Sequence, residues 1–280
     1  MAEATNSIEI IAAVKPLLFH PAVLAKMALG IDAISGGRFA INLVSAWFKP
    51  EMEKPRINFL THDERYRYIS DKWIKVVKAL WSGEKVNFYS EYFQINDLKL
   101  NPLAIAKPYP RVYVGEESEP AQEIVAKEAH TFFLNGRPIE VIRETIAQFA
   151  KRSKFSSQPL GFAMSAFVIA RPTDEEAEAE YQNLDSEVVM FKNMAKYFGV
   201  GSNGGTAAGL VGSYETVAHR IAEFTKVGID TFMLQFQPFA PEMERFAAEI
   251  IPRVRALTVA SEAMSATGCA YTNLKIGARG

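Results

Sequence analysis

Residues 35–51 read SGGRFAINLVSAWFKPE and indicate the fold most clearly. Gly36 and Gly37 are typical of a helix end, because glycine readily adopts the left-handed conformation that terminates many helices. The apolar run Phe39–Val44 follows at once and predicts a short buried strand. A helix, a glycine stop and a buried strand in succession predict a fold of alternating helices and parallel strands.

The same alternation continues on both sides of this stretch. Runs of β-branched and aromatic residues predict strands at Ile8–Val14, Phe39–Val44, Val112–Val114, Thr131–Leu134, Phe162–Ala170 and Thr231–Phe236. Apolar residues at three-to-four spacing predict helices at Pro21–Ile34, Asp63–Trp81, Ala121–Glu128, Pro138–Lys151, Asp174–Tyr197, Tyr214–Val227 and Pro241–Leu257. The sequence therefore predicts an α/β fold with a parallel sheet.

Shorter features mark the boundaries of these elements. Val86–Leu100 alternates apolar and polar residues and predicts a small antiparallel excursion. His62-Asp63 and Ser213 are predicted helix caps, and Gly228 is a predicted helix stop. Residues Gly199–Gly209 contain five glycines, from which we expect a loop without a packed element.

The composition excludes several classes of function. The chain has 280 residues, 49% hydrophobic and 22% charged, which suffices for one large core. Its 31 basic and 32 acidic residues give a formal net charge of −1, whereas a nucleic-acid partner requires a basic surface. No apolar run approaches the roughly 20 residues that span a bilayer, and residues 1–10 lack a signal-peptide layout. We therefore expect a cytoplasmic protein with neither a nucleic-acid nor a membrane partner.

The cysteine and histidine content argues against metal chemistry. The chain has one cysteine, Cys269, and four scattered histidines without the spacing of metal ligands. The sequence predicts no disulfide framework and no metal site.

Asn42 is the first candidate for a binding residue. It is a polar side chain inside an apolar predicted strand, and its burial costs free energy unless it finds hydrogen-bonding partners. A ligand whose edge offers both a donor and acceptors would supply such partners. Hydrogen bonds to neighbouring backbone would serve equally well, so this run alone leaves both interpretations open.

The run Thr61-His62-Asp63-Glu64-Arg65-Tyr66 is the second candidate, at the start of a long predicted helix. The free N–H groups of a helix start favour an anionic or electron-rich ligand, and Arg65 can pair with phosphate. Tyr66 can hydrogen-bond or lie against a ring. The alternative is an ordinary capped helix with a solvated charge cluster, which is the more common case for such a run.

Ser118 follows a strand and opens a predicted helix. Its hydroxyl can cap that helix, or it can turn toward a phosphate together with the adjacent N–H groups. The neighbouring glutamates argue against a bare phosphate unless cations offset them. Ser213, after Gly212, offers the same two roles, and here we favour the cap.

Taken together, in this order and at strand ends, these runs resemble the luciferase-like flavin-dependent monooxygenases. The resemblance extends from Ile8 to Leu257 and is strongest in residues 35–51, in HDERY at 62–66 and in GLVGSYETVAHRI at 209–221. It is specific to the FMN-dependent branch that includes two-component alkanesulfonate, dimethylsulfone and pyrimidine monooxygenases.

The resemblance implies a (β/α)8 TIM barrel, in which sites lie at the carboxyl ends of the strands. Residues 1–258 would form the barrel domain and residues 259–280 a C-terminal tail. Such a barrel has eight strands and the sequence shows about six, so we expect an N-terminally incomplete barrel that lacks its first two βα units. Relatives also commonly form homo-oligomers.

The resemblance further implies the cofactor and its contacts. FMN, used as FMNH2 with O2 as co-substrate, would be bound by Asn42, Glu51, Arg65, Tyr66 and Ser118, with His62 as a weaker candidate. An NAD(P)H:FMN reductase would supply the reduced flavin as a partner. The chain itself shows no GxGxxG fingerprint of a nicotinamide-binding domain, which agrees with this division.

The substrate class follows from residues that alkanesulfonate enzymes have and this sequence lacks. Their cationic and hydrogen-bonding positions match Ser165, Phe167, Asn203 and Gln237 here. A sulfonate in a dry pocket without cations is costly, so we favour a neutral sulfone such as dimethylsulfone. The apolar residues Trp47, Phe167 and Phe236 would line the pocket, although all three are equally suited to the core.

Several alternatives remain open. The substrate could be that of the alkanesulfonate or the pyrimidine monooxygenases. The chain could be a related F420-dependent oxidoreductase that transfers hydride without oxygen. It could instead be a truncated relative without catalytic activity. Gly199–Gly209 could be an active-site lid, or merely a connection.

Overall fold

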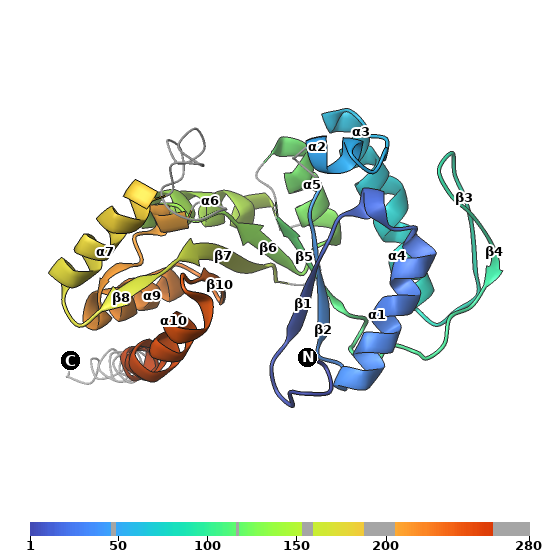
Figure 1. Ribbon diagram of the computed structural model, residues 1–280. Helices are drawn as coiled ribbons and strands as arrows, with labels where there is room; N and C mark the ends of the chain where they lie inside the picture. Colours follow the sequence, from blue (N-terminus) through green and yellow to red (C-terminus); the bar gives the residue numbers. More distant parts are fainter. Residues whose placement is uncertain (46–48, 116–117, 153–158, 188–204, 260–280) are drawn as a thin grey trace, which may run out of the picture. The chain divides into compact units, whose positions relative to one another are not determined.

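The computed structural model describes residues 1–45, 49–115, 118–152, 159–187 and 205–259 (Figure 1). These residues divide into two compact units. Unit 1 comprises residues 1–134 and 149–162, and unit 2 comprises residues 135–148 and those from 163 onward. Each unit is described separately below.

Unit 1 is built on four parallel strands. In order across the sheet, these are β1 (Ile10–Val14), β2 (Phe39–Leu43), β5 (Arg111–Gly115) and β6 (Thr131–Leu134). Their register places Asn42 of β2 between Ala13 of β1 and Tyr113 of β5. Apart from Asn42 and Thr131, strands β2 and β6 are apolar, as is typical of parallel strands covered on both faces. Because all four strands are parallel, their carboxyl ends lie at one edge of the sheet.

Helices pack against this sheet. They are α1 (Pro21–Ser35), α2 (Lys49–Glu53), α3 (His62–Arg67), α4 (Ile74–Trp81) and α5 (Glu119–Glu128), with a 3-10 turn at Pro16–Leu18. A π-helical turn at Tyr68–Trp73 joins α3 to α4. The indole N–H groups of Trp73 and Trp81, both buried, donate to the carbonyls of Phe19 and Ala25 at 2.8 and 3.2 Å. These hydrogen bonds fix the long helix against the α1 segment.

Unit 1 also contains the predicted hairpin. Strands β3 (Val86–Tyr89) and β4 (Gln94–Leu98) pair antiparallel within the segment Val86–Leu100. The prediction of an antiparallel excursion is confirmed.

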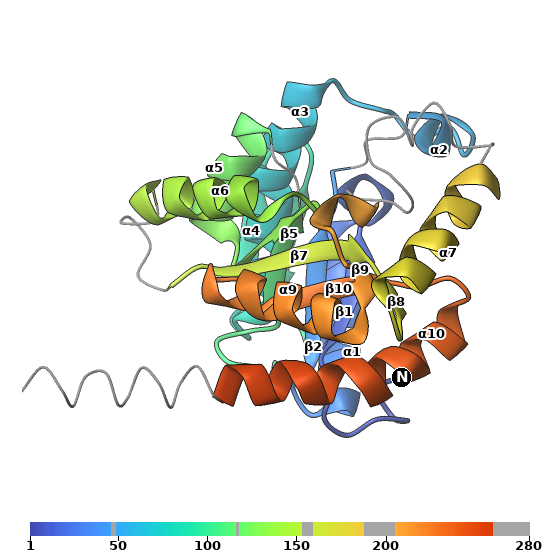
Figure 2. The ribbon, with the colours of Figure 1, turned by 90° about the vertical axis from the view of Figure 1, so that its left-hand side faces the viewer.

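Unit 2 contains two pairs of parallel strands (Figure 2). Strand β7 (Gly161–Phe167) pairs with β10 (Thr231–Gln235), and β8 (Ile169–Arg171) pairs with β9 (Val211–Ser213). The helices are α6 (Ile139–Arg152), α7 (Asp174–Glu187), α9 (Tyr214–Lys226) and α10 (Phe239–Arg245), the last continued by a π-helical turn at Phe246–Ile250. Helix α9 lies along β10, where Phe224 and Phe232 make an edge-to-face contact.

All six predicted strands form, but one prediction of a continuous strand is wrong. The run Phe162–Ala170 is two strands, β7 and β8, separated at Val168. The backbone N–H of Val168 donates to Gln235, whereas that of Ile169 donates to Leu210. The chain therefore changes hydrogen-bonding partner at this point, which an apolar run does not reveal.

Predictions for the loops and helix ends were partly wrong. The described end of Gly199–Gly209 forms a 3-10 turn at Gly205–Ala208 with Gly205, Thr206 and Ala208 buried, so this segment does contain a packed element. Residues 188–204, including the predicted end of the helix Asp174–Tyr197, lie outside the described residues. The cap of α3 is Thr61 and not His62-Asp63, because the Thr61 hydroxyl reaches the N–H of Glu64. By contrast, Gly36 (φ +67°) ends α1 as predicted.

The described helices also bear on a membrane location. None of those in the described ranges is both long and apolar enough to cross a membrane.

Candidate active site

The six predicted flavin-binding residues all belong to unit 1. Asn42 lies on β2, Glu51 on α2, and Ser118 at the start of α5. His62, Arg65 and Tyr66 lie on α3. Four parallel strands and the helices that follow them thus position these side chains at or beyond the carboxyl ends of β2 and β5.

Three of these residues carry a buried polar atom that has no hydrogen-bonding partner among the residues that the structure describes. The atoms are Oδ1 of Asn42, Nε of Arg65 and Oγ of Ser118. An unpaired buried polar group typically costs about 1–3 kcal/mol, so folded proteins rarely retain several of them without a use. One acceptor, one charged donor and one hydroxyl match what a flavin presents, namely a ring N–H and several oxygen acceptors. The donor set therefore fits an FMN molecule.

Asn42 faces the backbone of β5. A Cβ placed on Gly115 would lie 3.6 Å from the Asn42 Oδ1 atom, with no closer contact than 3.5 Å to Phe133. The missing side chain of Gly115 thus leaves space beside the unpaired oxygen. Gly115 therefore leaves room for about one methyl group beside the buried Asn42 oxygen.

Arg65 and Tyr66 are held by the start of α3. Thr61 and Glu64 form a reciprocal capping box, in which the Thr61 N–H donates to Glu64 Oε2 at 2.9 Å. The hydrogen bonds from the hydroxyl and the backbone of Thr61 lower the pKa of Glu64. The α3 segment is therefore a well-defined helix start, and this part of the alternative interpretation is correct. Arg65 and Tyr66 nevertheless point inward from it, with exposed fractions of 7% and 4%.

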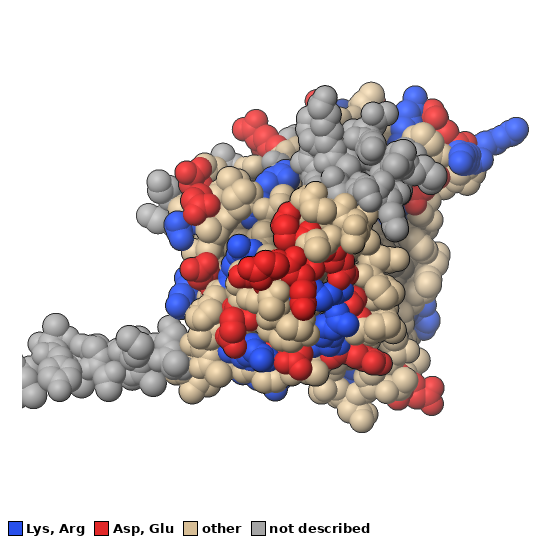
Figure 3. Space-filling view, turned by 60° about the vertical axis from the view of Figure 1, so that its left-hand side comes forward, with Lys and Arg blue, Asp and Glu red and all other residues tan. Residues whose placement is uncertain are grey.

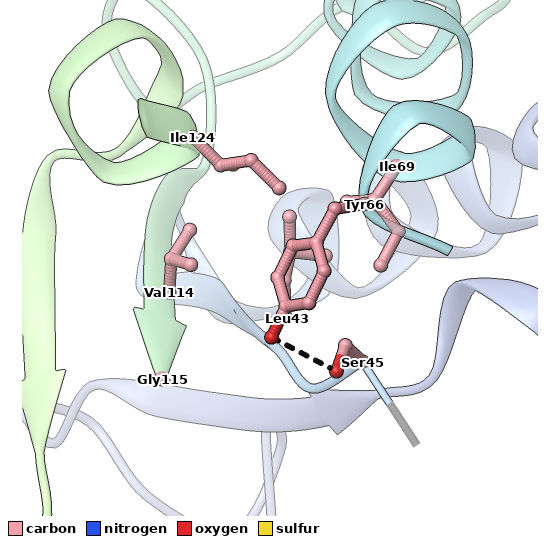
Figure 4. A pocket seen from close by; sticks show the side chains of 7 residues that line it. All are labelled: Leu43, Ser45, Tyr66, Ile69, Val114, Gly115 and Ile124. Carbon is pink, nitrogen blue, oxygen red and sulfur yellow. Dashed lines mark hydrogen bonds between the residues drawn. The ribbon is translucent and has the colours of Figure 1, made fainter. Parts of the chain in front are cut away.

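Tyr66 contacts a residue that sequence reasoning did not select. Its hydroxyl accepts a hydrogen bond of 3.3 Å from Ser45 Oγ, just beyond β2 (Figure 4). The two side chains border a cavity of about 10 Å³, which also touches Leu43, Val114 and Ile124. That volume holds about one water molecule and not a flavin ring. The cavity is therefore a small packing void beside Tyr66 and is too small to be the cofactor site.

Glu51 and His62 have partners within the protein. Glu51 forms an ion pair with Lys15, which directly follows β1. The His62 ring lies 4.8 Å from the Tyr66 ring, and its Nδ1 atom lies 3.1 Å from Asp63 Oδ1. A flavin bound by Glu51 would have to share that carboxylate with Lys15.

Ser118 lies at the N-cap position of α5 but makes no capping hydrogen bond with its side chain. Its carbonyl accepts a hydrogen bond from the N–H of Gln122 at 3.0 Å. Of the two roles that the sequence left open for this hydroxyl, the side-chain cap is absent. The hydroxyl is buried and has no partner within the described part of the chain.

The predicted substrate residues lie in unit 2 or outside the described residues. Phe167 is 6% exposed and packs with Ile169 and Ala177, which is the core role left open above. Phe236 packs against Phe239 and Phe246, with ring centroids 6.5 and 5.5 Å away. Trp47 and Asn203 lie outside the described residues.

Ser45 and Gly115 are site residues that sequence reasoning missed, although Ser45 lies within the stretch 35–51 quoted above. Ser45 is separated by two positions from Leu43, so alternation along the strand places both on one side, toward α3. The two-residue period of a strand is therefore the sequence signal that could have identified Ser45. No sequence signal points to Gly115, because its role depends on its position beside Asn42 of the neighbouring strand β2.

Comparisons with known proteins identify the family of the chain. A family model described as luciferase-like monooxygenase matches residues 1–231. The chain is 31% identical over 277 residues to an FMNH(2)-dependent dimethylsulfone monooxygenase of Pseudomonas putida, covering 91% of this chain and 76% of that protein.

Two solved structures share the fold at lower identity. A long-chain alkane monooxygenase has a TM-score of 0.77 at 21% identity, covering 91% of this chain and 71% of that one. A riboflavin lyase, solved with modified FMN and riboflavin, also has a TM-score of 0.77, at 19% identity and with coverage of 91% and 72%. The fold is thus that of the luciferase-like TIM barrels, as predicted, and the chain belongs to the luciferase-like monooxygenase family.

Proposed function

We propose that the protein is the oxygenase component of a two-component system. It takes FMNH2 from a separate NAD(P)H:FMN reductase and transfers one oxygen atom of O2 to a small neutral organosulfur compound, with dimethylsulfone as the first choice. The observation that carries the proposal is the group of unpaired buried atoms on Asn42, Arg65 and Ser118. The 31% identity to a dimethylsulfone monooxygenase supports it. We expect it to act in the cytoplasm as a homo-oligomer.

The proposed roles of the protein groups follow from their chemistry. When bound, reduced FMN supplies the two electrons that activate O2. Asn42 Oδ1 accepts a hydrogen bond from a ring N–H, while Arg65 Nε and Ser118 Oγ donate to oxygen atoms of the flavin. Tyr66, fixed by Ser45, orients the ligand from the α3 side. These contacts fix the position of the ring and shield it from water.

The substrate proposal rests on the absence of charge at particular positions. Ser165 and Phe167 on β7 and Gln237 after β10 are uncharged, and Ser165 is fully buried. An anionic sulfonate that loses its hydration without an ion partner pays at least several kcal/mol. A neutral sulfone avoids this cost, so Phe236, Phe167 and Trp47 are retained as candidates for an apolar pocket wall.

The test is a competition between substrate classes with the purified chain, an FMN reductase and NAD(P)H. Formation of methanesulfinate from dimethylsulfone should exceed sulfite release from methanesulfonate or octanesulfonate by at least about tenfold, a ratio that needs only about 1.4 kcal/mol. Oxygen uptake measured in parallel separates oxygen transfer from F420-dependent hydride transfer.

Other outcomes would contradict specific parts of the proposal. Sulfite release as fast as sulfone turnover would show that another cation, such as Lys15 or Arg137, binds the substrate. Reduction of substrate with F420 and without oxygen uptake would refute the monooxygenase assignment. The absence of FMN binding, measured by fluorescence quenching, would refute the flavin site.

A further inference from the structure

An open hollow beside α2 is not explained by the flavin-binding residues. Its volume is about 460 Å³, within the range of roughly 300–1,000 Å³ typical of small-molecule sites. The residues that line it are Lys49, Glu53, Arg56, Ile57, Asn58 and Phe59. We call it the α2 hollow.

The positive charge of the α2 hollow comes from Arg56. Lys49 and Glu53 neutralise each other, because the Lys49 Nζ atom lies 3.0 Å from Glu53 Oε1. Arg56 is exposed, and among the described residues its guanidinium has neither an ion-pair nor a hydrogen-bonding partner. The hollow therefore offers one uncompensated cation, together with the amide of Asn58, to an anionic group.

Arg56 occupies a backbone position that glycine would adopt at lower cost. Its φ is +60°, and the N–H groups of Arg56 and Ile57 donate to the carbonyls of Glu53 and Met52, both at 2.9 Å. This is the left-handed turn that often ends a helix, where glycine is the usual residue. Arginine at this position places a positive charge at the rim of the hollow, although it adopts this backbone conformation less readily than glycine would.

Phe59 forms the aromatic wall and connects the hollow to the flavin-binding residues. The guanidinium carbon of Arg65 lies 4.3 Å from the centre of the Phe59 ring, and Arg65 Nη1 donates to the carbonyl of Leu60 at 2.7 Å. Arg65 is 93% buried, since its exposed fraction is 7%, and its Nε has no partner. The buried guanidinium of Arg65, whose Nε is unpaired, therefore packs against the Phe59 ring.

We propose that the α2 hollow is an arrival site for flavin mononucleotide, at which Arg56 pairs with the phosphate and Phe59 contacts the apolar part of the molecule. The inference rests on the proposed function, in which flavin must reach this chain from a separate reductase. A cation and an aromatic ring at the rim attract a planar molecule that carries a dianion. The site is distinct from the contacts at Asn42 and Ser118.

The experiment measures association rates of FMN and of riboflavin, which lacks the phosphate, by stopped-flow fluorescence with the full chain. Arg56→Gln should slow FMN association about three- to tenfold at low salt and leave riboflavin association unchanged. Arg56→Lys should retain most of the wild-type rate, and about 0.5 M salt should abolish the difference. Lys54→Gln is the matched control, because it removes an exposed cation from the same segment that does not line the hollow.

A second variant guards against a folding defect. Arg56→Gly should slow FMN association like Arg56→Gln while the melting temperature stays equal or rises, because glycine adopts the left-handed turn more easily. Wild-type FMN association in both variants would overturn the arrival site and leave the proposed function intact. Inorganic phosphate that binds in an Arg56-dependent way without slowing FMN would identify a free-anion site and would also overturn the flavin assignment. No FMN binding by the wild type would refute both proposals.

Discussion

Ser118 and Ser213 occupy equivalent positions but make different contacts. Ser213 accepts a hydrogen bond from the Thr216 N–H at 3.2 Å and also contacts Thr216 Oγ1 at 2.8 Å, so it caps α9 as predicted. Ser118 makes no such bond, and its buried hydroxyl is unpaired. The sequence favours the cap for Ser213 and leaves both roles open for Ser118, because both are serines at a strand-to-helix junction and the difference lies in the backbone around them.

This contrast gives a matched pair of variants. Ser118→Ala should change the free energy of unfolding by less than about 0.5 kcal/mol but weaken FMN binding by about 1–2 kcal/mol. Ser213→Ala should lose about 1 kcal/mol of stability and leave FMN binding unchanged. Urea denaturation and flavin titration measure the two quantities. Equal effects of both variants on stability would assign Ser118 a structural role.

Gly115 allows a test of Asn42 without changing Asn42 itself. The Cβ of Gly115→Ala would make only ordinary van der Waals contacts, at 3.5 Å or more, so the variant should fold normally. Its methyl group would occupy the space beside Asn42 Oδ1 and should weaken FMN binding at least about tenfold, by loss of a buried hydrogen bond. Unchanged FMN affinity would exclude Asn42 as a ring contact from this side.

At the scale of elements, His130 joins two strands of unit 1. The Nδ1 atom of its ring accepts a hydrogen bond from the backbone N–H of Val112 at 3.1 Å, and the backbone N–H of His130 donates to the Val112 carbonyl at 2.8 Å. Burial, aided by the positive charges of Lys78 and Arg111, lowers the pKa of His130 to about 4. The histidine is therefore neutral in the folded protein at pH 7.

The sign of the pH effect follows from this lowered pKa. An unfolded chain with a histidine pKa near 6.5 binds a proton that the folded protein excludes until about pH 4. Stability from neutral His130 is fully present above pH 6.5 and is lost as the pH falls from about 6.5 to 4. His130→Gln should flatten this part of the stability profile, whereas His219→Gln, at an exposed helix position, should leave it unchanged. A profile that is the same in all three proteins would contradict the assignment.

Unit 2 is stabilised by a partly buried charge cluster that connects β8, α7 and α10. Arg171 binds Glu242 through both ends of its guanidinium, at 2.7 and 3.2 Å, and also pairs with Glu180. Arg245 adds a bond of 2.9 Å to Glu242, which is 7% exposed. Acidic side chains gather over α7 on this face, with basic ones beside them (Figure 3).

Removing the central cation should leave Glu180 without its ion pair and the buried Glu242 with Arg245 as its remaining cation. Arg171→Leu is expected to lower the free energy of unfolding by about 3 kcal/mol, measured by chemical denaturation. Arg253→Leu is the control, since it breaks the more exposed pairs with Glu215 and Glu249 and should have a much smaller effect. Similar losses in both variants would show that burial at Arg171 contributes nothing.

The elements were predictable wherever an apolar pattern sets them. The buried runs at β2 and β6 and the three-to-four spacing at α1 and α9 appear in the structure within one or two residues of the predicted limits. The break at Val168 was not predictable, because it depends on which strand supplies the hydrogen bonds. Short helix α2 was missed because five residues give too little periodicity. For the site, residue types were sufficient to choose Asn42, but its unpaired oxygen depends on the neighbouring strand.

At the scale of the whole molecule, the assignment of all six predicted flavin-binding residues to unit 1 has a measurable consequence. FMN at about 100 times its dissociation constant adds roughly 2.7 kcal/mol to the stability of the form that binds it. In hydrogen exchange, we expect FMN to slow amides of β2, β5 and α5 more than those of α7 and α10. Greater protection in unit 2 would place the flavin contacts elsewhere.

The π-helical turn at Tyr68–Trp73 sets the rotational phase between two parts of one helix. A π-turn accommodates about one extra residue in an α-helix, and each residue of an α-helix rotates the chain by about 100°. Upstream, α3 directs Arg65 and Tyr66 inward, and downstream Trp81 faces the core. Deleting a single residue from 68–73 would therefore convert the π-turn to regular α-helix and keep the two ends in phase. The same deletion within α3 or α4 has no π-turn to absorb it and would rotate the residues beyond it by about a quarter of a turn. Along this helix, the loss of one residue would therefore be best tolerated at the π-turn.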